Sequence, residues 1–202
     1  NRLQSELPGK NSHISMAPVW EDKIMRSFTP SKNSVPCGVL IILFSGENSN
    51  KLKVILTLRS KHINHSGQIS FPGGRQEADE TIVETAIREA QEEIGLEPSD
   101  IEIIGTLSEL YVPPSNSLIT PVVCFAMRSI HPTATSDEVD EVFSVSLDSL
   151  LSPEKFKKEM WNFHGLEMEV PFWDVHHSTP LWGATAMMLK ELLVLYEEHL
   201  NN

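Results

Sequence analysis

The chain has 202 residues, 40% of them hydrophobic, and a formal net charge of −12. This length suits a single domain, residues 1–202, with a sizeable core and terminal extensions. The negative charge argues against a nucleic acid polymer as partner, because phosphate contacts need clustered Lys and Arg. It does not argue against a small anion that arrives with metal ions.

The cysteines and the apolar runs indicate the cellular compartment in which the protein is expected. Cys37 and Cys124 are isolated and lack metal-ligand spacing, so we expect two buried free thiols, as in a reducing compartment. No apolar run approaches membrane-spanning length, and no signal peptide opens the chain. These features predict a cytoplasmic protein without membrane contact. They do not predict an oligomeric state, and a homodimer is left open.

The first 36 residues are polar and contain prolines at positions 8, 18, 30 and 36. We expect one short helix near the start and irregular chain after it, because proline interrupts regular structure. Lys23 and Arg26 lie in this stretch and are candidates to contact a substrate phosphate.

A β-hairpin is predicted next. Residues 39–44 form a short continuous apolar run, which is typical of a buried strand. Residues 46–50 have turn chemistry, and residues 53–58 read as the paired strand.

A polar loop follows this hairpin. Arg59 opens it and is a candidate phosphate ligand, because a guanidinium fork suits phosphate geometry. We expect His62 and His65 to be solvated loop residues, because two histidines without a third ligand make a poor metal site.

Residues 71–96 read FPGGRQEADETIVETAIREAQEEIGL. A proline-glycine-glycine turn opens the stretch, and Thr81 and Glu84 then have the spacing of a capping box, which predicts a helix start. Gly95 predicts the helix end, because glycine enters the left-handed conformation without steric cost. An apolar stripe predicts the core-facing side, formed by Ile82, Ala86, Ala90 and Ile94 with Val83 and Ile87 beside them.

The other face of this helix is acidic. The stretch carries seven carboxylates and only two basic residues, and like charges at helical spacing destabilise a helix. A bound divalent cation is the obvious candidate to offset the repulsion. Glu89, Glu92 and Glu93 share one face, and hard oxygen ligands at that spacing suit Mg²⁺ or Mn²⁺. The main-chain carbonyl near Gly74 is a further candidate ligand, because glycine lets backbone approach closely.

Three more strands are predicted beyond the helix, at residues 101–107, 121–127 and 141–147, with a proline-containing loop at 111–117. Glu138 lies in the turn before the last of these strands. It is the candidate loop carboxylate, either as a metal ligand or as a base, and the alternative is a plain exposed acid.

The C-terminal part predicts a hairpin at residues 163–173 around Gly165 and a helix at 181–200. We expect the Met and Leu residues of that helix to lie in the core. His176 and His177 lie between these elements, and one of them is a candidate substrate contact.

The acidic stretch is similar to the signature of the Nudix hydrolases. The match covers 23 residues and holds at every fixed position, namely Gly74, Glu80, Arg88, Glu89, Glu92, Glu93 and Gly95. The resemblance implies an α/β fold, the Nudix-type α/β/α sandwich with a mixed β-sheet. It also implies hydrolysis of a diphosphate that links a nucleoside to another group, with Mg²⁺ or Mn²⁺ as cofactor.

The same resemblance implies the metal ligands. Glu89 and Glu93 would be the principal ones, and Glu92 would also ligate or position water. The Gly74 carbonyl would complete part of the shell.

It further implies how the loop and the helix act together. Arg88 would pair with nearby carboxylates, Glu80 first, and hold the loop against the helix. Glu92, Glu93 or Glu138 would accept the proton, and the sequence does not choose between them.

A second motif precedes the first. Residues 56–60 (LTLRS), Gly67 and the FPGG tetrapeptide are similar to the extra motif of the coenzyme A pyrophosphatase branch. The match departs at Asn64, where the branch has arginine, and the gap to Gly67 is one residue shorter. This resemblance implies coenzyme A or a derivative as substrate, cleaved to 3′,5′-ADP and 4′-phosphopantetheine. The expected substrate contacts are Arg59, Ser60, Gly73 and Gly74.

Three alternatives accompany this hypothesis. The substrate could be another nucleoside diphosphate derivative, such as ADP-ribose, a dinucleotide or an oxidised nucleotide. The chain could also be a non-catalytic binding module of the same fold, although such modules typically lose the glutamates that are present here. A purely structural acidic helix is the third reading.

Overall fold

The computed structural model describes residues 2–24, 26–46, 49–61, 67–163 and 165–201. His62, Asn64 and His65 lie outside the described residues, as do residues 47–48 in the predicted hairpin turn.

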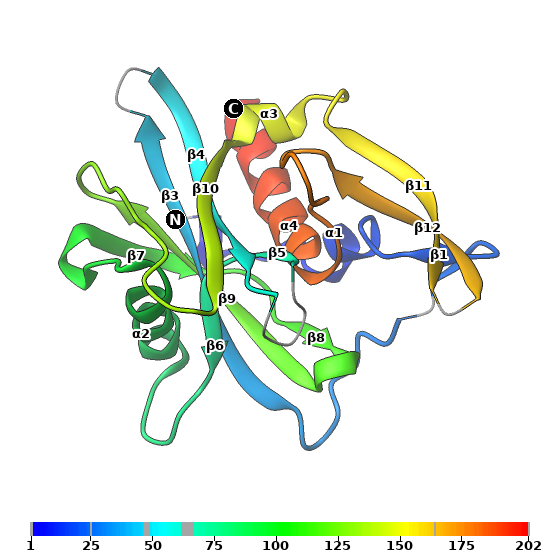
Figure 1. Ribbon diagram of the computed structural model, residues 1–202, viewed down its shortest axis with the longest axis horizontal. Coiled ribbons are helices and arrows are strands. Elements are labelled where there is room, and N and C mark those ends of the chain that lie inside the picture. Colours follow the sequence, from blue (N-terminus) through cyan, green and yellow to red (C-terminus); the bar gives the residue numbers. More distant parts are fainter. Residues whose placement is uncertain (1, 25, 47–48, 62–66, 164, 202) are drawn as a thin grey trace.

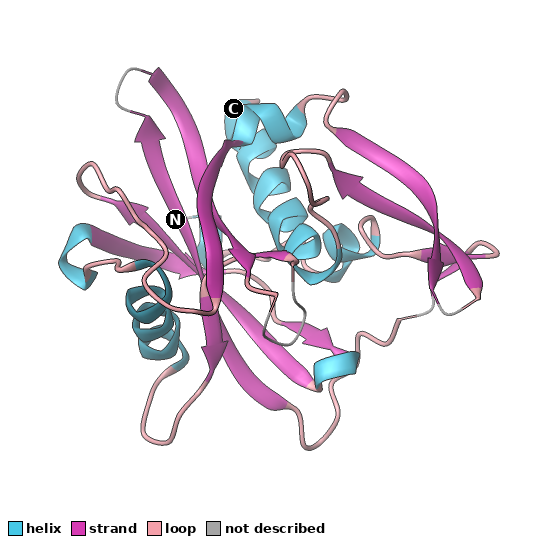
Figure 2. Cartoon of the chain, viewed as in Figure 1, coloured by secondary structure: helices cyan, strands magenta, loops and turns pink. Residues whose placement is uncertain are grey.

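The centre of the fold is a mixed sheet whose main path runs β10-β4-β3-β9-β7 (Figures 1 and 2). Strands β3 and β9 are parallel, whereas the other neighbours on this path are antiparallel. The strands are β3 (Val35–Gly46), β4 (Ser49–Arg59), β7 (Ile101–Thr106), β9 (Ser117–Ala126) and β10 (Val139–Ser146). Three short strands pair with this path: β5 (Ile69–Ser70) with β4, β6 (Gly73–Arg75) with β3 and β8 (Leu110–Val112) with β9.

Helices cover both faces of this sheet. In β3, Leu40 and Ile42 pack toward α2 (Ile82–Ile94), whereas Ile41 and Leu43 belong to the cluster that includes α4 (Gly183–Leu200). Side chains alternate along a strand, so one continuous apolar run serves both cores. The predicted α/β/α arrangement with a mixed sheet is confirmed.

A second sheet lies on the α4 side, with the order β11-β12-β1-β2. It joins the hairpin of β11 (Phe156–Phe163) and β12 (Leu166–Trp173) to two short N-terminal strands, β1 (Val19–Trp20) and β2 (Lys23–Ile24). The expected short N-terminal helix is present as α1 (Lys10–Ile14), but the prediction of only irregular chain after it is wrong. A strand of two residues is too short to show an alternation of apolar and polar residues. Strands β1 and β2 therefore form because of the strands they pair with, not because of a pattern in their own sequence.

Several predicted boundaries also shift. Gly73 and Gly74 lie in β6, paired with Cys37–Val39 of β3, rather than in a free turn. The expected loop at 111–117 contains the last two residues of β8, a 3₁₀ turn at Pro113–Ser115 and the first residue of β9. The C-terminal hairpin turns where predicted, but its first strand begins at Phe156. Strand β11 is mostly exposed, and its apolar residues do not alternate regularly, so no strand pattern is readable before residue 163.

The remaining elements are short. They are α3 (Leu147–Leu151) and 3₁₀ turns at Arg2–Gln4 and Pro98–Asp100. Cys37 and Cys124 are buried free thiols, as predicted. In the described part of the chain, no helix combines the length and the apolar character that crossing a membrane would require.

Candidate active site

Helix α2 sets the orientation of the acidic residues. Thr81 caps its first turn, since the Thr81 hydroxyl accepts the Glu84 N–H at 3.3 Å and the Glu84 carboxylate accepts the Thr81 N–H at 2.7 Å. Gly95 closes the helix in the left-handed conformation. Both ends were predicted. The expectation that all three glutamates lie opposite the core stripe is wrong for Glu93, which is three residues from Ala90 and seven from Ala86 and is buried on their side of α2.

Burial separates the three candidate glutamates. Glu93 is only 3% exposed, the Glu89 side chain is 18% exposed and the Glu92 side chain is 59% exposed. The Glu93 carboxylate accepts the Gly73 N–H at 3.2 Å. A Cβ added at Gly74 would overlap the Glu89 carboxylate, so glycine is needed for this close approach. Two of the three carboxylates therefore lie against β6.

Burial of these carboxylates carries an electrostatic cost. Loss of water raises the pKa of Glu93 to about 7, although Arg59 and the Gly73 N–H oppose the change. Burial likewise raises the pKa of Glu89, with Arg88 opposing it. A positive ligand beside these groups would favour their charged forms.

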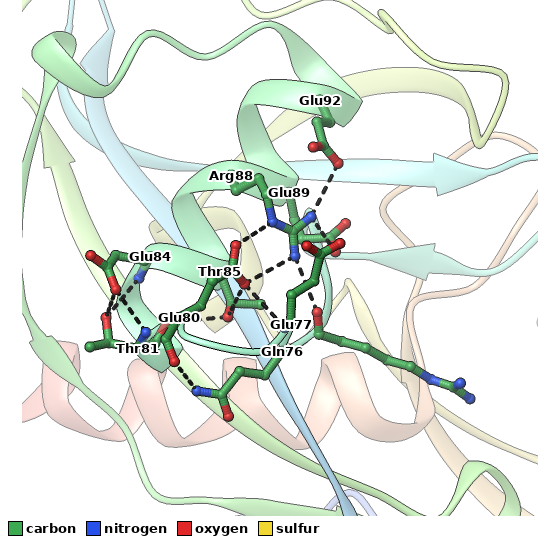
Figure 3. Close-up of polar contacts among 10 residues, drawn as sticks. Gln76, Glu77, Glu80, Thr81, Glu84, Thr85, Arg88, Glu89 and Glu92 are labelled. Carbon is green, nitrogen blue, oxygen red and sulfur yellow. Dashed lines mark hydrogen bonds and ion pairs between the residues drawn. The ribbon is translucent and has the colours of Figure 1, made fainter.

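Arg88 is the centre of a polar network on the exposed side of α2 (Figure 3). Its Nε donates to Glu80 at 2.6 Å, and its Nη1 donates to Glu89 at 3.0 Å and to Glu92 at 3.2 Å. Its Nη2 donates to the Arg75 carbonyl at 3.2 Å.

These contacts account for part of the charge balance that the sequence assigned to a cation. The guanidinium lowers the pKa of Glu80 to about 2, helped by the Thr85 hydroxyl, and the carboxylates raise the pKa of Arg88. The predicted contact between Arg88 and Glu80 is therefore present. It fixes the loop before α2 onto the helix.

Arg59 joins the cluster from the end of β4. Its Nη1 lies 3.9 Å from the Glu93 Oε1, and its Nη2 lies 3.8 Å from the Glu138 Oε2. Both distances exceed hydrogen-bond length, so neither carboxylate holds the guanidinium tightly. Ser60 is 2% exposed, and its N–H donates to the Glu138 carbonyl at 2.8 Å. Its predicted contact with substrate stays a prediction.

The loop that carries Glu138 is anchored on α2. The Thr135 N–H donates to the Glu93 carbonyl at 3.0 Å, and the Thr135 hydroxyl donates to the Glu92 carbonyl at 2.8 Å. Glu138 itself is exposed, with 58% of its side chain in solvent. The sequence predicted this carboxylate, but nothing in its pattern indicated that Thr135 would hold the loop.

A cavity of about 470 Å³ adjoins the acidic cluster and shares Arg59, Gly73 and Gly74 with it. Arg26 also lines this cavity, with Nη2 donating to the Tyr111 carbonyl and Nη1 in contact with the Met187 sulfur. Lys23 is exposed in β2 and is not among the residues that line it. The remaining walls are mainly apolar and include Val39, Phe71, Val112, Ile119, Met168, Trp182 and Met188.

Sequence reasoning missed these apolar walls. Most of them come from β3, β8, β9, β12 and α4, whereas Phe71 and Trp182 lie just outside these elements, and most read individually as core. Of these apolar residues, only Phe71 belongs to a motif that the sequence indicated, the FPGG tetrapeptide.

The donor set suits a hard dication. Glu89 and Glu93 contribute carboxylate oxygens, and the peptide of Gly74 lies beside them, which gives the oxygen-only environment that Mg²⁺ and Mn²⁺ prefer. Glu92 is close enough to share Arg88 with Glu89. The oxygen chemistry of these residues therefore fits the metal that the sequence predicts.

Comparison with known proteins agrees with this geometry. The NUDIX domain family matches residues 36–165. Nudix hydrolase 22, chloroplastic, of Arabidopsis thaliana is 34% identical over 91% of this chain and 59% of that protein. The peroxisomal coenzyme A diphosphatase NUDT7 of Mus musculus is 40% identical over 52% of this chain and 45% of that protein. The chain thus aligns with about half of each of these two relatives.

A solved structure shows the same fold. The Nudix hydrolase RenU of M. Smegmatis superposes with a TM-score of 0.59 at 17% identity, covering 85% of this chain and 95% of that one. Since the family match spans residues 36–165 and contains the whole acidic cluster, this chain belongs to the Nudix family.

Proposed function

We propose that the chain is a Mg²⁺- or Mn²⁺-dependent hydrolase that cleaves the diphosphate bridge of coenzyme A or its derivatives. The products are 3′,5′-ADP and 4′-phosphopantetheine, or the acyl form of the latter. One observation carries the proposal: Glu89 and Glu93 lie against Gly73–Gly74, with Arg59 beside them, at the edge of an apolar cavity.

Glu89 and Glu93 would hold the cation, with Glu92 and the Gly74 carbonyl as further ligands. When bound, the cation would neutralise oxygen charge in the transition state and lower the pKa of a coordinated water. The chain's own part is positioning, since phosphoryl transfer depends largely on alignment and charge stabilisation. Arg59 binds a diphosphate oxygen, because its contacts to Glu93 and Glu138 leave its N–H groups free of close hydrogen bonds to them.

Glu138 is the proton acceptor that this arrangement favours. Glu93 is buried beneath the cluster as a metal ligand, and Glu92 accepts a hydrogen bond from Arg88. Glu138 is exposed, lies beside Arg59 and is held in place through its own main chain by Ser60. It can therefore take a proton from a water near the diphosphate and release it to solvent.

The apolar cavity favours coenzyme A over a smaller nucleotide. A volume of about 470 Å³ bounded by Met168, Trp182 and Met188 suits an uncharged arm such as pantetheine or its acyl thioester. The relative named as a coenzyme A diphosphatase supports the same substrate.

Other relatives are named only as Nudix hydrolases, so another nucleoside diphosphate derivative remains the second candidate. The observation that supports this second candidate is the exposure of Glu92 and Glu138. Because both side chains face solvent, this side of the cluster does not restrict the chemical nature of the leaving group.

A substrate panel with Mg²⁺ or Mn²⁺ tests the proposal. Coenzyme A, an acyl derivative, ADP-ribose and a dinucleotide are incubated with the chain, and the products are identified by mass spectrometry. We expect coenzyme A or its acyl form to be cleaved best, to the two products named above. Turnover of ADP-ribose without turnover of coenzyme A would favour the second candidate, and no turnover of any diphosphate would favour a binding module.

A further inference from the structure

A second group of metal-ligating side chains lies on the α4 side of the large sheet. Glu141 comes from β10, and His176 and His177 come from the segment between β12 and α4 (Figure 1). One ligand atom from each of the three residues lies within 4.8 Å of the others. We propose that Glu141, His176 and His177 bind a transition-metal ion of the zinc class, separately from the carboxylates of α2.

The strand places Glu141 toward the histidines. A β-bulge between Val139 and Glu141 shifts the register of β10 against β4, and such bulges re-aim side chains. Beyond the bulge, Glu141 and Phe143 are two residues apart and so share one face. Both contact His176: the Glu141 Oε2 lies 3.2 Å from its Nε2, and the Phe143 ring centroid lies 5.0 Å from its ring.

The His176 ring is fixed on its other side as well. Ser178 contacts the His176 Nδ1 twice: its N–H donates to this nitrogen at 3.4 Å, and its hydroxyl lies 3.3 Å from it, so the position open to an ion is that of the Nε2 proton, beside Glu141. The side chain of His176 is only 4% exposed. Because Ser178 holds Nδ1, the orientation of the ring is fixed with Nε2 toward the Glu141 carboxylate.

His177 supplies the second imidazole. Consecutive side chains in extended backbone point to opposite sides, but a bend here brings the two rings to 4.2 Å between centroids. The neighbouring rings and the carboxylate form a nitrogen-nitrogen-oxygen set, which suits Zn²⁺ or Co²⁺ rather than Mg²⁺.

The distances allow closure around one ion. In a tetrahedral zinc site, neighbouring ligand atoms lie about 3.4 Å apart, since metal–nitrogen bonds are about 2.0–2.1 Å. The Glu141–His176 pair already meets this spacing. His177 is exposed, so a rotation of its side chain can bring its ring nitrogen in.

A bound ion would join two parts of the fold. The histidine segment leads into Trp182 and Gly183, which line the cavity, and β10 begins beside Glu138. A bound ion would therefore link one wall of the cavity to β10, the strand that follows Glu138. We expect it to stabilise the folded chain in addition to being bound.

Co²⁺ titration tests the site in a chain whose α2 ligands are removed by Glu89→Gln and Glu93→Gln. We expect this variant to bind one equivalent by calorimetry and to show the visible absorption of cobalt with nitrogen ligands. Adding His177→Ala should lower the affinity by at least about tenfold, whereas adding His199→Ala, an exposed histidine on α4, should leave it unchanged. His177 is exposed, so its replacement should leave the fold intact.

Thermal unfolding supplies an independent measurement. Zn²⁺ should raise the Tm of the Glu89→Gln/Glu93→Gln chain, because an ion that binds only the folded state stabilises it. His177→Ala should remove that rise. Absence of Co²⁺ uptake, or equal affinity with and without His177, would overturn the proposal and leave a hydrogen-bonded Glu141–His176 pair.

Discussion

Glu93 is the most deeply buried glutamate of α2. It lies 3% exposed beneath Arg59, with the Gly73 N–H as a hydrogen-bond donor. A buried carboxylate with a pKa raised to about 7 is unfavourable unless a positive group compensates it. This is the physical reason to regard Glu93 as a metal ligand.

Replacing Glu93 with Gln tests this role. Gln keeps the shape and the acceptor for the Gly73 N–H but lacks the charge that a dication needs. We expect kcat to fall by at least about 100-fold, as when a strong electrostatic contact is lost, with little change in Tm. Steady-state kinetics and thermal unfolding measure the two effects, with Glu197→Gln on the exposed part of α4 as control. Full activity in Glu93→Gln would refute the assigned role.

Gly74 offers a second test at the residue scale. A Cβ at this position would overlap the Glu89 carboxylate, so Gly74→Ala must displace either the carboxylate or β6. We expect a loss of about 10- to 100-fold in kcat/KM, comparable to disturbance of metal-site support, and a higher Mg²⁺ requirement. Activity measured across a range of Mg²⁺ concentrations checks this. An unchanged Mg²⁺ dependence would mean that Glu89 does not ligate the ion.

The sequence predicted which residues form this cluster, but not which of them are buried and which are exposed. Spacing brings Glu89, Glu92 and Glu93 together within about one turn, but the prediction that all three lie opposite the core stripe is wrong for Glu93. It does not show that Glu93 is buried while Glu92 is exposed, because that depends on how β6 packs across the helix. Nor did it show that Arg88 would contact both Glu89 and Glu92.

At the scale of elements, the N-terminal segment is joined to α4 by one buried carboxylate. Glu191 is 0% exposed, and it accepts hydrogen bonds from the Gly9 N–H at 3.0 Å and from the Ser108 hydroxyl at 2.7 Å. The His13 Nε2 lies 2.9 Å from its second oxygen. These partners lower the pKa of Glu191 even though burial opposes the change.

Glu191→Ala should therefore destabilise the chain by about 3 kcal/mol, because its buried partners lose their acceptor. The folded-state pKa is lowered, so the carboxylate's contribution is present above its unfolded pKa of about 4.3 and declines as pH falls below that value. Urea unfolding at neutral pH and near pH 4 should show the difference from wild type shrinking at the lower pH. A difference as small as that of the exposed control Glu197→Ala would contradict this account.

Helices and strands with a long sequence pattern were predicted correctly. Short strands that form only because they pair with a distant strand were not. Helix α2 and the apolar run of β3 carry their own capping or burial signals, so both were predicted. Strands β1 and β2 have two residues each and exist because β12 pairs with β1. Strand β6 looked like a turn because glycines there serve close packing against Val39 rather than chain reversal.

For the whole molecule, the cavity depends on both sheets and on α4. Its walls range from Pro18 to Met188, and most of these residues carry no sequence signal of a site. The fold class followed from a local motif, whereas the cavity requires the tertiary arrangement of distant segments. The proposed substrate is therefore argued from the chemistry of the cavity, and the proposed reaction is argued from the acidic cluster.

The central claim is that the carboxylates of α2 hold a hard dication beside a diphosphate. Calorimetric titration of Mn²⁺ into the purified chain, in the presence of a nonhydrolysable diphosphate analogue, tests it most directly. The account predicts Mn²⁺ uptake by the wild type, strongly weakened uptake by Glu93→Gln and unchanged uptake by Glu197→Gln. Absence of uptake by the wild type, or equal uptake by Glu93→Gln, would contradict it.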